Sequence, residues 1–332
     1  MLFVIPTENG HFNNYISLFK NRIDFEGSYI LDKTSFKNVF HFILFLIKQK
    51  KRNIVFFHGE KHYLVSVLTS LIFRRILGGK VSSVFYYAYA GNNSLIKSIV
   101  YRTSLLVLKM AGLQAYYLEL PFKNVNANYH KFFSVLHDPV LIEFNEGAQS
   151  TNRIYDRSVS LLVAGFLDER KCIGEIIAAC NLLLENGHFD KVEITLLGCQ
   201  SSDVESIIKN AKLHKSVFLI QKKYRFEDNE LIDEMRKTDI VLAIYDHHFG
   251  SSGIVINAVA LNKKVAFVSY GVCESFYDEL NISEKLNSTD PTAICSFVSG
   301  LAACHVSQYS EKNRIAFLNK RKPVNFVESL SK

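Results

Sequence analysis

The sequence contains no tryptophan, only 5 prolines and no two cysteines in the spacing C-x-x-C. With 48% hydrophobic and 21% charged residues, it does not have the composition of a disordered chain. The missing C-x-x-C spacing excludes the common cysteine zinc sites and redox pairs. All six cysteines fall among apolar neighbours in the second half, which predicts small buried side chains in a cytosolic protein.

Long apolar runs are missing as well. The longest, Val39–Ile47, is much shorter than the roughly 20 residues that cross a bilayer, and residues 95–113 contain three basic side chains. The N-terminal residues lack the basic start and the small-residue cleavage site of a signal peptide. We therefore expect a cytoplasmic protein that is either soluble or attached peripherally to the inner face of a membrane.

Charge is distributed unevenly along the chain. Residues 1–156 hold 18 Lys and Arg against 10 Asp and Glu, whereas residues 157–332 hold 21 against 22. No nucleic-acid recognition motif accompanies the basic half, so we expect no nucleic acid among the partners. An anionic membrane surface or a pyrophosphate-bearing acceptor fits this charge instead. Residues 36–52 favour a buried helix with a solvated basic end over membrane insertion, and peripheral attachment stays open.

Short apolar runs alternate with helical patterns through both halves. Runs of β-branched and aromatic residues predict buried strands, and the spacing between them predicts helices, so we expect an α/β fold with parallel sheets covered on both faces. The expected strands are 2–5, 28–31, 53–57, 83–89, 159–164, 192–197, 216–220, 240–244 and 264–268. The expected helices are 11–20, 36–51, 62–77, 94–112, 173–187, 202–212, 228–237, 253–261, 290–303 and 306–320.

The polar residues 145–158 contain no apolar period and predict a linker between two domains. We expect an N-terminal domain at 1–150, a C-terminal domain at 151–305 and a final helical segment at 306–332. Each domain would be doubly wound. Ligands are then expected at the carboxyl ends of the strands and in the cleft between the domains.

A glycine and a lysine frame the loop after the first strand of the second domain. Gly165 follows the apolar run 159–164, and Lys171 lies six residues later at the start of a helical pattern. A turn glycine lets a ligand approach the backbone, and a lysine can pair with a phosphate. The alternative is a plain strand–turn–helix in which Lys171 is a solvated cap.

Two serines begin a helix after the expected strand 240–244. Ser251, Ser252 and Gly253 lead directly into an apolar helical pattern. Serine side chains cap the free N–H groups of a helix start, and the same N–H groups at the positive end of the helix dipole can bind phosphate. An ordinary helix cap without a ligand is the alternative.

Together these two elements resemble the donor domain of glycosyltransferase family 4, also called glycosyl transferases group 1. Residues 165–171 are similar to the G-x-L-x-x-x-K element of that family, and residues 238–271 to its donor-site region. Two positions depart from the family pattern: Phe166 replaces an arginine, and Asn257 replaces the glutamate that holds the ribose. The resemblance implies the GT-B fold, in which two Rossmann-like doubly wound domains face each other across a cleft.

The resemblance also implies which residues contact a nucleotide-diphosphate sugar. Arg170 would supply the charge that Phe166 lacks. Glu8, His11 and Asp246 are the candidate catalytic groups. The expected donor contacts are Gly10, Gly165, Arg170, Lys171, Lys222, Ser251, Ser252, Gly253, Ile254 and Asn257.

The expected reaction follows from the same resemblance. No D-x-D motif suggests a diphosphate held by a metal ion, so we expect a metal-independent, retaining glycosyltransferase with no cofactor besides its donor substrate. The acceptor would be a glycan or a lipid-linked oligosaccharide, in the synthesis of a surface polysaccharide of the O-antigen or capsule type. Two alternatives remain: a nucleotide-sugar 2-epimerase of similar architecture, and a non-catalytic nucleotide-sugar-binding partner subunit, which Phe166 and Asn257 would favour.

Overall fold

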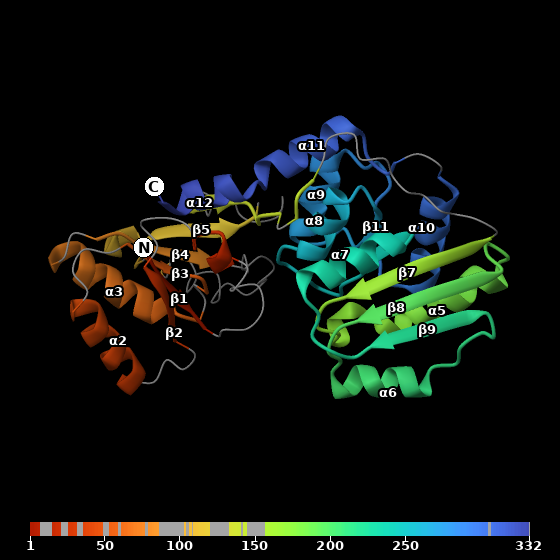
Figure 1. Ribbon diagram of the computed structural model, residues 1–332, viewed down its shortest axis with the longest axis horizontal. Coiled ribbons are helices and arrows are strands. Elements are labelled where there is room, and N and C mark those ends of the chain that lie inside the picture. The colour runs from red at the N-terminus through yellow and green to blue at the C-terminus, as the bar shows by residue number, and fades with distance from the viewer. Residues whose placement is uncertain are drawn as a thin grey trace. The chain divides into compact units, whose positions relative to one another are not determined.

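The computed structural model of the chain divides into two compact units. Unit 1 comprises Met1–Pro139 and Arg321–Lys332, and unit 2 comprises Val140–Lys320. Each unit is built on a parallel sheet that carries helices on both faces (Figure 1). The structure describes residues 1–6, 15–20, 26–31, 36–48, 53–58, 61–76, 79–85, 103, 106–107, 109–119, 133–140, 142–144, 157–304 and 307–331.

The sheet of unit 1 has six parallel strands in the order β2-β1-β3-β4-β5-β6. Strands β1 and β3 are buried along their whole length, which explains why the sequence shows them as continuous apolar runs. The strands are β1 Leu2–Ile5, β2 Gly27–Ile30, β3 Ile54–Phe56, β4 Val81–Phe85, β5 Gln114–Leu118 and β6 Ser134–Leu136.

Helices cover both faces of this sheet, as two neighbouring phenylalanines at the end of β3 show. The helices are α2 Phe36–Lys48, α3 Tyr63–Ile76 and α12 Pro323–Ser331. Successive side chains of a strand point to opposite faces. Phe56 packs against Phe42 of α2, with ring centroids 6.0 Å apart, whereas Phe57 stacks on Phe326 of α12 at 6.4 Å. His62, next to α3, also contacts Phe56, so α3 begins on the α2 side.

A buried ion pair holds the last helix of the chain on unit 1. The Arg321 guanidinium donates to both carboxylate oxygens of Glu119, at 2.9 and 2.8 Å, and both side chains are fully buried. Glu119 also accepts hydrogen bonds from the Asp138 N–H and lies 3.0 Å from His137 Nδ1. Since a buried charge without partners is costly, this network fixes where the chain enters α12.

The sheet of unit 2 has five parallel strands in the order β11-β10-β7-β8-β9. The chain winds outward from β7 to β9 and then returns to β10 on the other side of β7. The strands β7 and β10 therefore flank the topological switch point, where doubly wound sheets bind ligands at the strands' carboxyl ends. The strands are β7 Ser158–Ala164, β8 Lys191–Leu197, β9 Val217–Lys222, β10 Ile240–Ala243 and β11 Lys264–Phe267.

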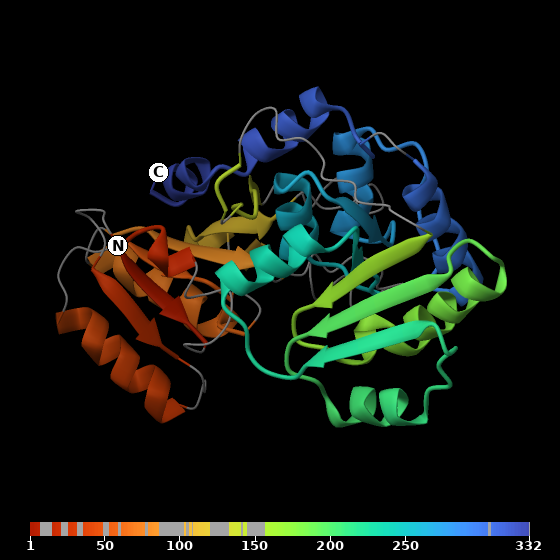
Figure 2. The same cartoon turned by 45° about the vertical axis from the view of Figure 1, so that its right-hand side comes forward.

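Right-handed crossovers place the helices of unit 2 on the two faces of the sheet. α5 and α6 cover one face together with α10, which packs against α5, and α7 and α8 cover the other (Figure 2). The helices are α5 Ile173–Glu185, α6 Ser202–Asn210, α7 Asp228–Lys237, α8 Gly253–Ala260, α9 Val272–Leu280, α10 Pro291–Ala303 and α11 Glu311–Lys320, preceded by the short 3₁₀ turn Glu169–Lys171.

Three buried cations cap the carboxyl ends of helices in unit 2. Lys263 donates to carbonyl oxygens at the end of α7, Lys264 to the Cys304 carbonyl after α10, and Arg314 to the last carbonyl of α8. Carbonyls at a helix end lack partners within the helix and carry its negative dipole charge, so a cation there stabilises the helix. The three cations remain buried because these bonds compensate their desolvation.

The expected α/β fold with two parallel sheets is confirmed. The expected strands and helices of the second half all form, most of them within one or two residues of the expected ends. The strands β5 and β6 and the helix α9 were not predicted from the sequence, and α12 was predicted only as part of the helical segment 306–332. The expectation of buried cysteines was wrong for Cys199 and Cys304, which are exposed, although the other four cysteines are buried.

The division between the units differs in detail from the expected domain bounds. It falls between Pro139 and Val140 rather than between residues 150 and 151, and most of the expected linker lies outside the described residues. The expected final segment 306–332 is two helices, of which α11 belongs to unit 2 and α12 to unit 1. None of the described helices combines the length and the apolar content that a membrane span requires.

Candidate functional site

Two glycines bring the loops after β7 and β8 close together at the carboxyl edge of the unit 2 sheet. Gly165 has a φ of +111°, and Gly198 has a φ of +132°. A Cβ atom on Gly198 would lie 2.0 Å from the Gly165 carbonyl oxygen, so a side chain there would displace the loop. The backbone of both loops is thereby fixed beside the switch point between β7 and β10.

Lys171 points back from the 3₁₀ turn toward the end of β7. Its ammonium donates to the Ala164 carbonyl oxygen at 2.7 Å and to the Tyr245 hydroxyl at 3.4 Å, and it lies 4.6 Å from the centroid of the Tyr245 ring. A Cβ atom at position 165 would lie 3.0 Å from the ammonium nitrogen, so Gly165 leaves the space that this group occupies.

Burial decides the charge state of Lys171. The side chain is only 7% exposed, and desolvation lowers its pKa to about 7, although the negative charge of Asp168 opposes the shift. Among the described residues, no carboxylate forms an ion pair with it. An anion arriving at this position would favour the charged form and raise the pKa again.

Ser252 begins α8 and contacts the same tyrosine. Its hydroxyl accepts a hydrogen bond from the Val255 N–H at 3.4 Å and lies 3.2 Å from the Tyr245 hydroxyl. Tyr245 follows β10 and therefore connects Lys171, after β7, with the first turn of α8. Ser252 and Tyr245 are 3% and 9% exposed. The lysine and the serine-capped helix thus lie together at the carboxyl end of the sheet.

The remaining expected contacts on α8 surround its first turn. Ser251, Gly253 and Ile254 are partly exposed there, and Asn257 follows one turn later, also partly exposed. The first turn carries no acidic side chain, so its positive end is available to an anion. The Asn257 amide can donate and accept hydrogen bonds but adds no charge. Donor binding by these residues stays a prediction.

Arg170 and Asp246 lie next to Lys171 but are engaged with neighbours. The Arg170 guanidinium forms an ion pair with Asp168 at 2.7 Å, and its backbone carbonyl accepts a hydrogen bond from the Asp246 N–H at 2.8 Å. The Asp246 carboxylate is exposed and lies 3.5 Å from His247 Nε2. The structure therefore places a cation and a carboxylate at the rim of the site, both accessible to a ligand.

The other expected site residues are not brought to Lys171 by the described structure. Lys222 ends β9, the edge strand beyond β8, and forms an ion pair with Glu234 at 3.0 Å. Glu8, Gly10 and His11 lie outside the described residues.

Tyr245 and Gln200 were not predicted from the sequence, whereas His248 is offered by the sequence either as an exposed loop histidine or in place of the first glutamate of the family pattern. His248 is largely buried, lies 3.1 Å from the Ser251 carbonyl oxygen through Nε2, and packs its ring against Tyr245 at 5.0 Å; burial lowers its pKa. Both polar atoms of the Gln200 side chain, and one carboxylate oxygen of Asp168, are buried without a hydrogen-bond partner among the described residues. Residues 167 and 200 form a parallel bridge between the two loops, so these unpaired groups lie near the same edge.

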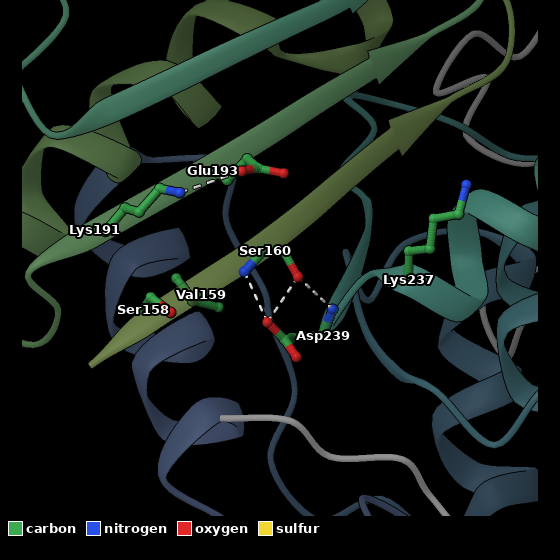
Figure 3. Close-up of a pocket in the computed structure, with 7 residues that line it drawn as sticks. All are labelled: Ser158, Val159, Ser160, Lys191, Glu193, Lys237 and Asp239. Atoms are coloured by element: carbon green, nitrogen blue, oxygen red, sulfur yellow. Dashed lines mark hydrogen bonds and ion pairs between the residues drawn. The ribbon is translucent and has the colours of Figure 1, made fainter. Parts of the chain in front are cut away.

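A pocket of unit 2 lies at the opposite edge of the sheet and does not form part of this site. Figure 3 shows it at the amino ends of β7 and β8, with Lys191, Glu193 and Lys237 around it. Asp239 accepts hydrogen bonds from the Ser160 N–H at 2.8 Å and from its hydroxyl at 2.7 Å, so its charge is already compensated. These bonds fix the start of β10 beside β7, and we assign them a structural role.

Solved structures of similar fold include several glycosyltransferases. A trehalose-6-phosphate synthase studied for glycosyl transfer with retention is 12% identical, with a TM-score of 0.64, and the match covers 99% of this chain and 98% of the other. The chain has the GT-B fold. The Anabaena HepE protein, solved with UDP and glucose, is 10% identical with a TM-score of 0.65 and coverage of 99% and 98%.

A third similar structure is the trehalose-phosphate synthase of Burkholderia xenovorans in complex with glucose-6-phosphate. It is 11% identical, has a TM-score of 0.60, and is matched over 91% of this chain and 79% of its own. Neither a protein-family model nor a curated protein sequence matches the chain. At identities this low, the likeness establishes the fold and leaves the substrates to be argued from the residues.

Proposed function

We propose that the protein is a glycosyltransferase that moves a sugar from a nucleotide diphosphate to a glycan or lipid-linked acceptor. The observation that carries this proposal is the chain of contacts from Lys171 through Tyr245 to Ser252. It joins a buried amine, which forms no ion pair with a carboxylate among the described residues, to the positive end of α8 at the switch point of the sheet. The proteins of similar fold include one solved with UDP and one with a sugar phosphate, which supports the substrate class.

The site would act mainly on the leaving group. As the bond between the anomeric carbon and the diphosphate oxygen breaks, its electron pair leaves with the diphosphate. The Lys171 ammonium and the free N–H groups of α8 would stabilise that growing charge, without a metal ion. The Ser252 cap and Tyr245 hold these donors in place before the substrate arrives, so little reorganisation is needed.

The acceptor side is proposed from the resemblance. An acceptor hydroxyl would bond to the anomeric carbon with retention of configuration, and its proton would pass to the departing phosphate oxygen or to a base. Glu8, His11 and Asp246 are the candidate groups. We further propose that the product is a surface polysaccharide of the O-antigen or capsule type, and that the enzyme works in the cytoplasm at the inner face of a membrane.

A non-catalytic nucleotide-sugar-binding subunit is the second candidate. Phe166, where the family has an arginine, is 59% exposed and cannot contribute charge to a diphosphate. Asn257 likewise replaces a carboxylate. Such a protein would bind the donor through Lys171 and α8 but transfer nothing.

Ligand screening followed by product analysis tests both candidates. We expect UDP, GDP or dTDP, alone or as a sugar conjugate, to raise the melting temperature of the wild-type protein. Lys171→Met should abolish this shift, whereas the matched control Lys237→Met, which removes an exposed lysine at the opposite edge of the sheet, should retain it. With a lipid-linked glycan acceptor, release of nucleoside diphosphate supports the transferase. Binding without release supports the binding subunit, and the absence of any shift would reject both.

A further inference from the structure

Helix α3 exposes leucine side chains, although it buries serines together with Val65 and Val67. Ser66 and Ser70 are buried, and their hydroxyls donate to the carbonyl oxygens of Tyr63 and Ala111, each at 2.8 Å. The outward side chains are Leu64, Leu68 and Leu71, which are 73%, 46% and 41% exposed. A helix that buries serines and exposes leucines at the spacing i, i+4, i+7 presents an apolar stripe to its surroundings.

Helix α2 exposes a second stripe of the same spacing. Phe42 and Leu46 are buried, and Phe42 packs on β3 through Phe56. On the outside, Phe40, Leu44 and Ile47 are each more than 40% exposed. The helix is therefore apolar on two sides, although the sheet can cover only one of them.

The two stripes belong to one surface of unit 1. α2 connects β2 with β3, and α3 connects β3 with β4, so both crossovers advance in the same direction across the sheet. Right-handed crossovers that advance in one direction lie on one face, and the contacts of Phe42 and His62 with Phe56 place both helices there. Figure 1 shows α2 and α3 on the side of the sheet away from α12. We call this surface the apolar face: Phe40, Leu44, Ile47, Leu64, Leu68 and Leu71.

Positive charge accompanies the apolar face. The sequence from residue 33 to residue 118 contains 13 Lys and Arg and a single acidic residue, Glu60, although the whole chain has a net charge of only +7. Lys37 on α2 and Lys61 beside α3 are exposed. Pairing this face with the same face of a second copy would bring these exposed lysines together, which disfavours a dimer and favours an anionic partner.

We propose that the apolar face docks unit 1 on the surface of an anionic lipid bilayer. The leucine and phenylalanine side chains would enter the boundary between headgroups and acyl chains, and the lysines would contact lipid phosphates. The proposed contact is peripheral, and none of the described helices is long and apolar enough to cross a bilayer. The proposal deepens the proposed function by giving the protein access to a lipid-linked acceptor, but it rests on unit 1 alone.

Vesicle co-sedimentation of the full-length protein tests this docking. Wild type should bind vesicles of phosphatidylglycerol and phosphatidylcholine, and bind vesicles of phosphatidylcholine alone more weakly. The variant Leu64→Ser/Leu68→Ser/Leu71→Ser should bind the anionic vesicles at least about tenfold more weakly. Because all three side chains are exposed, its circular dichroism and its nucleotide binding through unit 2 should match wild type. The control Ile207→Ser/Leu213→Ser/Val324→Ser removes exposed apolar residues elsewhere and should bind vesicles like wild type.

Two further experiments show whether a lipid surface or a second copy of the protein covers the apolar face: vesicle binding by a lysine variant, and sedimentation velocity. Lys37→Glu/Lys61→Glu should weaken binding by about tenfold or more, since each lysine near an anionic surface contributes about 1 kcal/mol. Equal binding of wild type and the leucine variant, or no binding of wild type to anionic vesicles, would overturn the proposal. So would a wild-type dimer in sedimentation velocity that the leucine variant converts to a monomer, because that result identifies a second copy as the occupant. If the wild-type protein bound anionic vesicles as expected but bound no nucleotide, the proposed function would be overturned and the proposed docking would stand.

Discussion

At the residue scale, Lys171 can be buried beside the end of β7 because position 165 has no side chain. A Cβ atom at position 165 would come within 3.0 Å of the Lys171 nitrogen. The Ala164 carbonyl and the Tyr245 hydroxyl hold the amine there through hydrogen bonds, and neither group carries a negative charge. Gly165, Lys171 and Ser252 could be found from the sequence because each belongs to a local pattern. Tyr245 and Gln200 could not, because their positions depend on which loops meet in space.

The variant Gly165→Ala tests whether the space beside Gly165 is needed for nucleotide binding as well as for stability. The alanine would be strained at a φ of +111° and would press on the ammonium, so we expect a loss of about 1–3 kcal/mol in the free energy of unfolding and weaker nucleotide binding. Gly187→Ala is the control, since Gly187 also has a positive φ but a Cβ atom there would meet nothing within 4 Å. Chemical denaturation and calorimetry measure both quantities, and equal nucleotide affinity in the two variants would contradict the arrangement.

At the element scale, the helix α8 combines a structural cap with the candidate binding site. The sequence predicted this helix because serines precede an apolar helical pattern, and it predicted β7 and β10 because most of their side chains are apolar and buried. It did not predict β5 and β6, because β6 is only three residues long and β5 begins with an exposed glutamine. The exposed leucines of α3 were not predicted either, because a count of apolar positions does not reveal which of them face outward.

Ser252→Ala should cost stability and nucleotide affinity together. Loss of the cap bond to the Val255 N–H removes about 1 kcal/mol from the free energy of unfolding, and the Tyr245 hydroxyl keeps Lys171 but loses Ser252 as a partner. Ser201 caps α6 through an equivalent bond to the Val204 N–H, so Ser201→Ala should show a similar loss of stability with unchanged nucleotide affinity. If Ser201→Ala weakened nucleotide binding as much as Ser252→Ala did, the special role of α8 would be refuted. Thermal denaturation and titration calorimetry provide the comparison.

At the scale of the whole molecule, Lys171 and α8 belong to unit 2, whereas the apolar face belongs to unit 1. The GT-B fold follows from two parallel sheets, which the alternating pattern of the sequence indicated, and the donor-site candidates that the structure describes all lie in unit 2. The return of α12 to unit 1 could not be read from the sequence, because it depends on an ion pair between residues 119 and 321.

Arg321→Met should therefore weaken unit 1 selectively. The substitution leaves the Glu119 carboxylate buried without its cation, and we expect a loss of about 3–5 kcal/mol in the stability of that unit. Nucleotide binding by unit 2 should persist. Replacing both residues with methionine should recover part of the loss, because no buried charge then remains. Denaturation followed by circular dichroism, with nucleotide binding measured alongside, tests this; equal losses in the single and double variants would show that the carboxylate is not the cause.

Lys171 is proposed to receive the diphosphate of the donor, and the uptake of a proton on binding tests this role most directly. In the free protein its pKa is about 7, so at about pH 8 the amine is mostly neutral. A bound diphosphate raises this pKa, so binding should take up a proton, and affinity should fall as the pH rises above about 7. Calorimetric titration of UDP at about pH 8, in two buffers of different ionisation enthalpy, should show proton uptake in wild type and in Lys237→Met but none in Lys171→Met. Equal proton uptake in Lys171→Met would contradict the account.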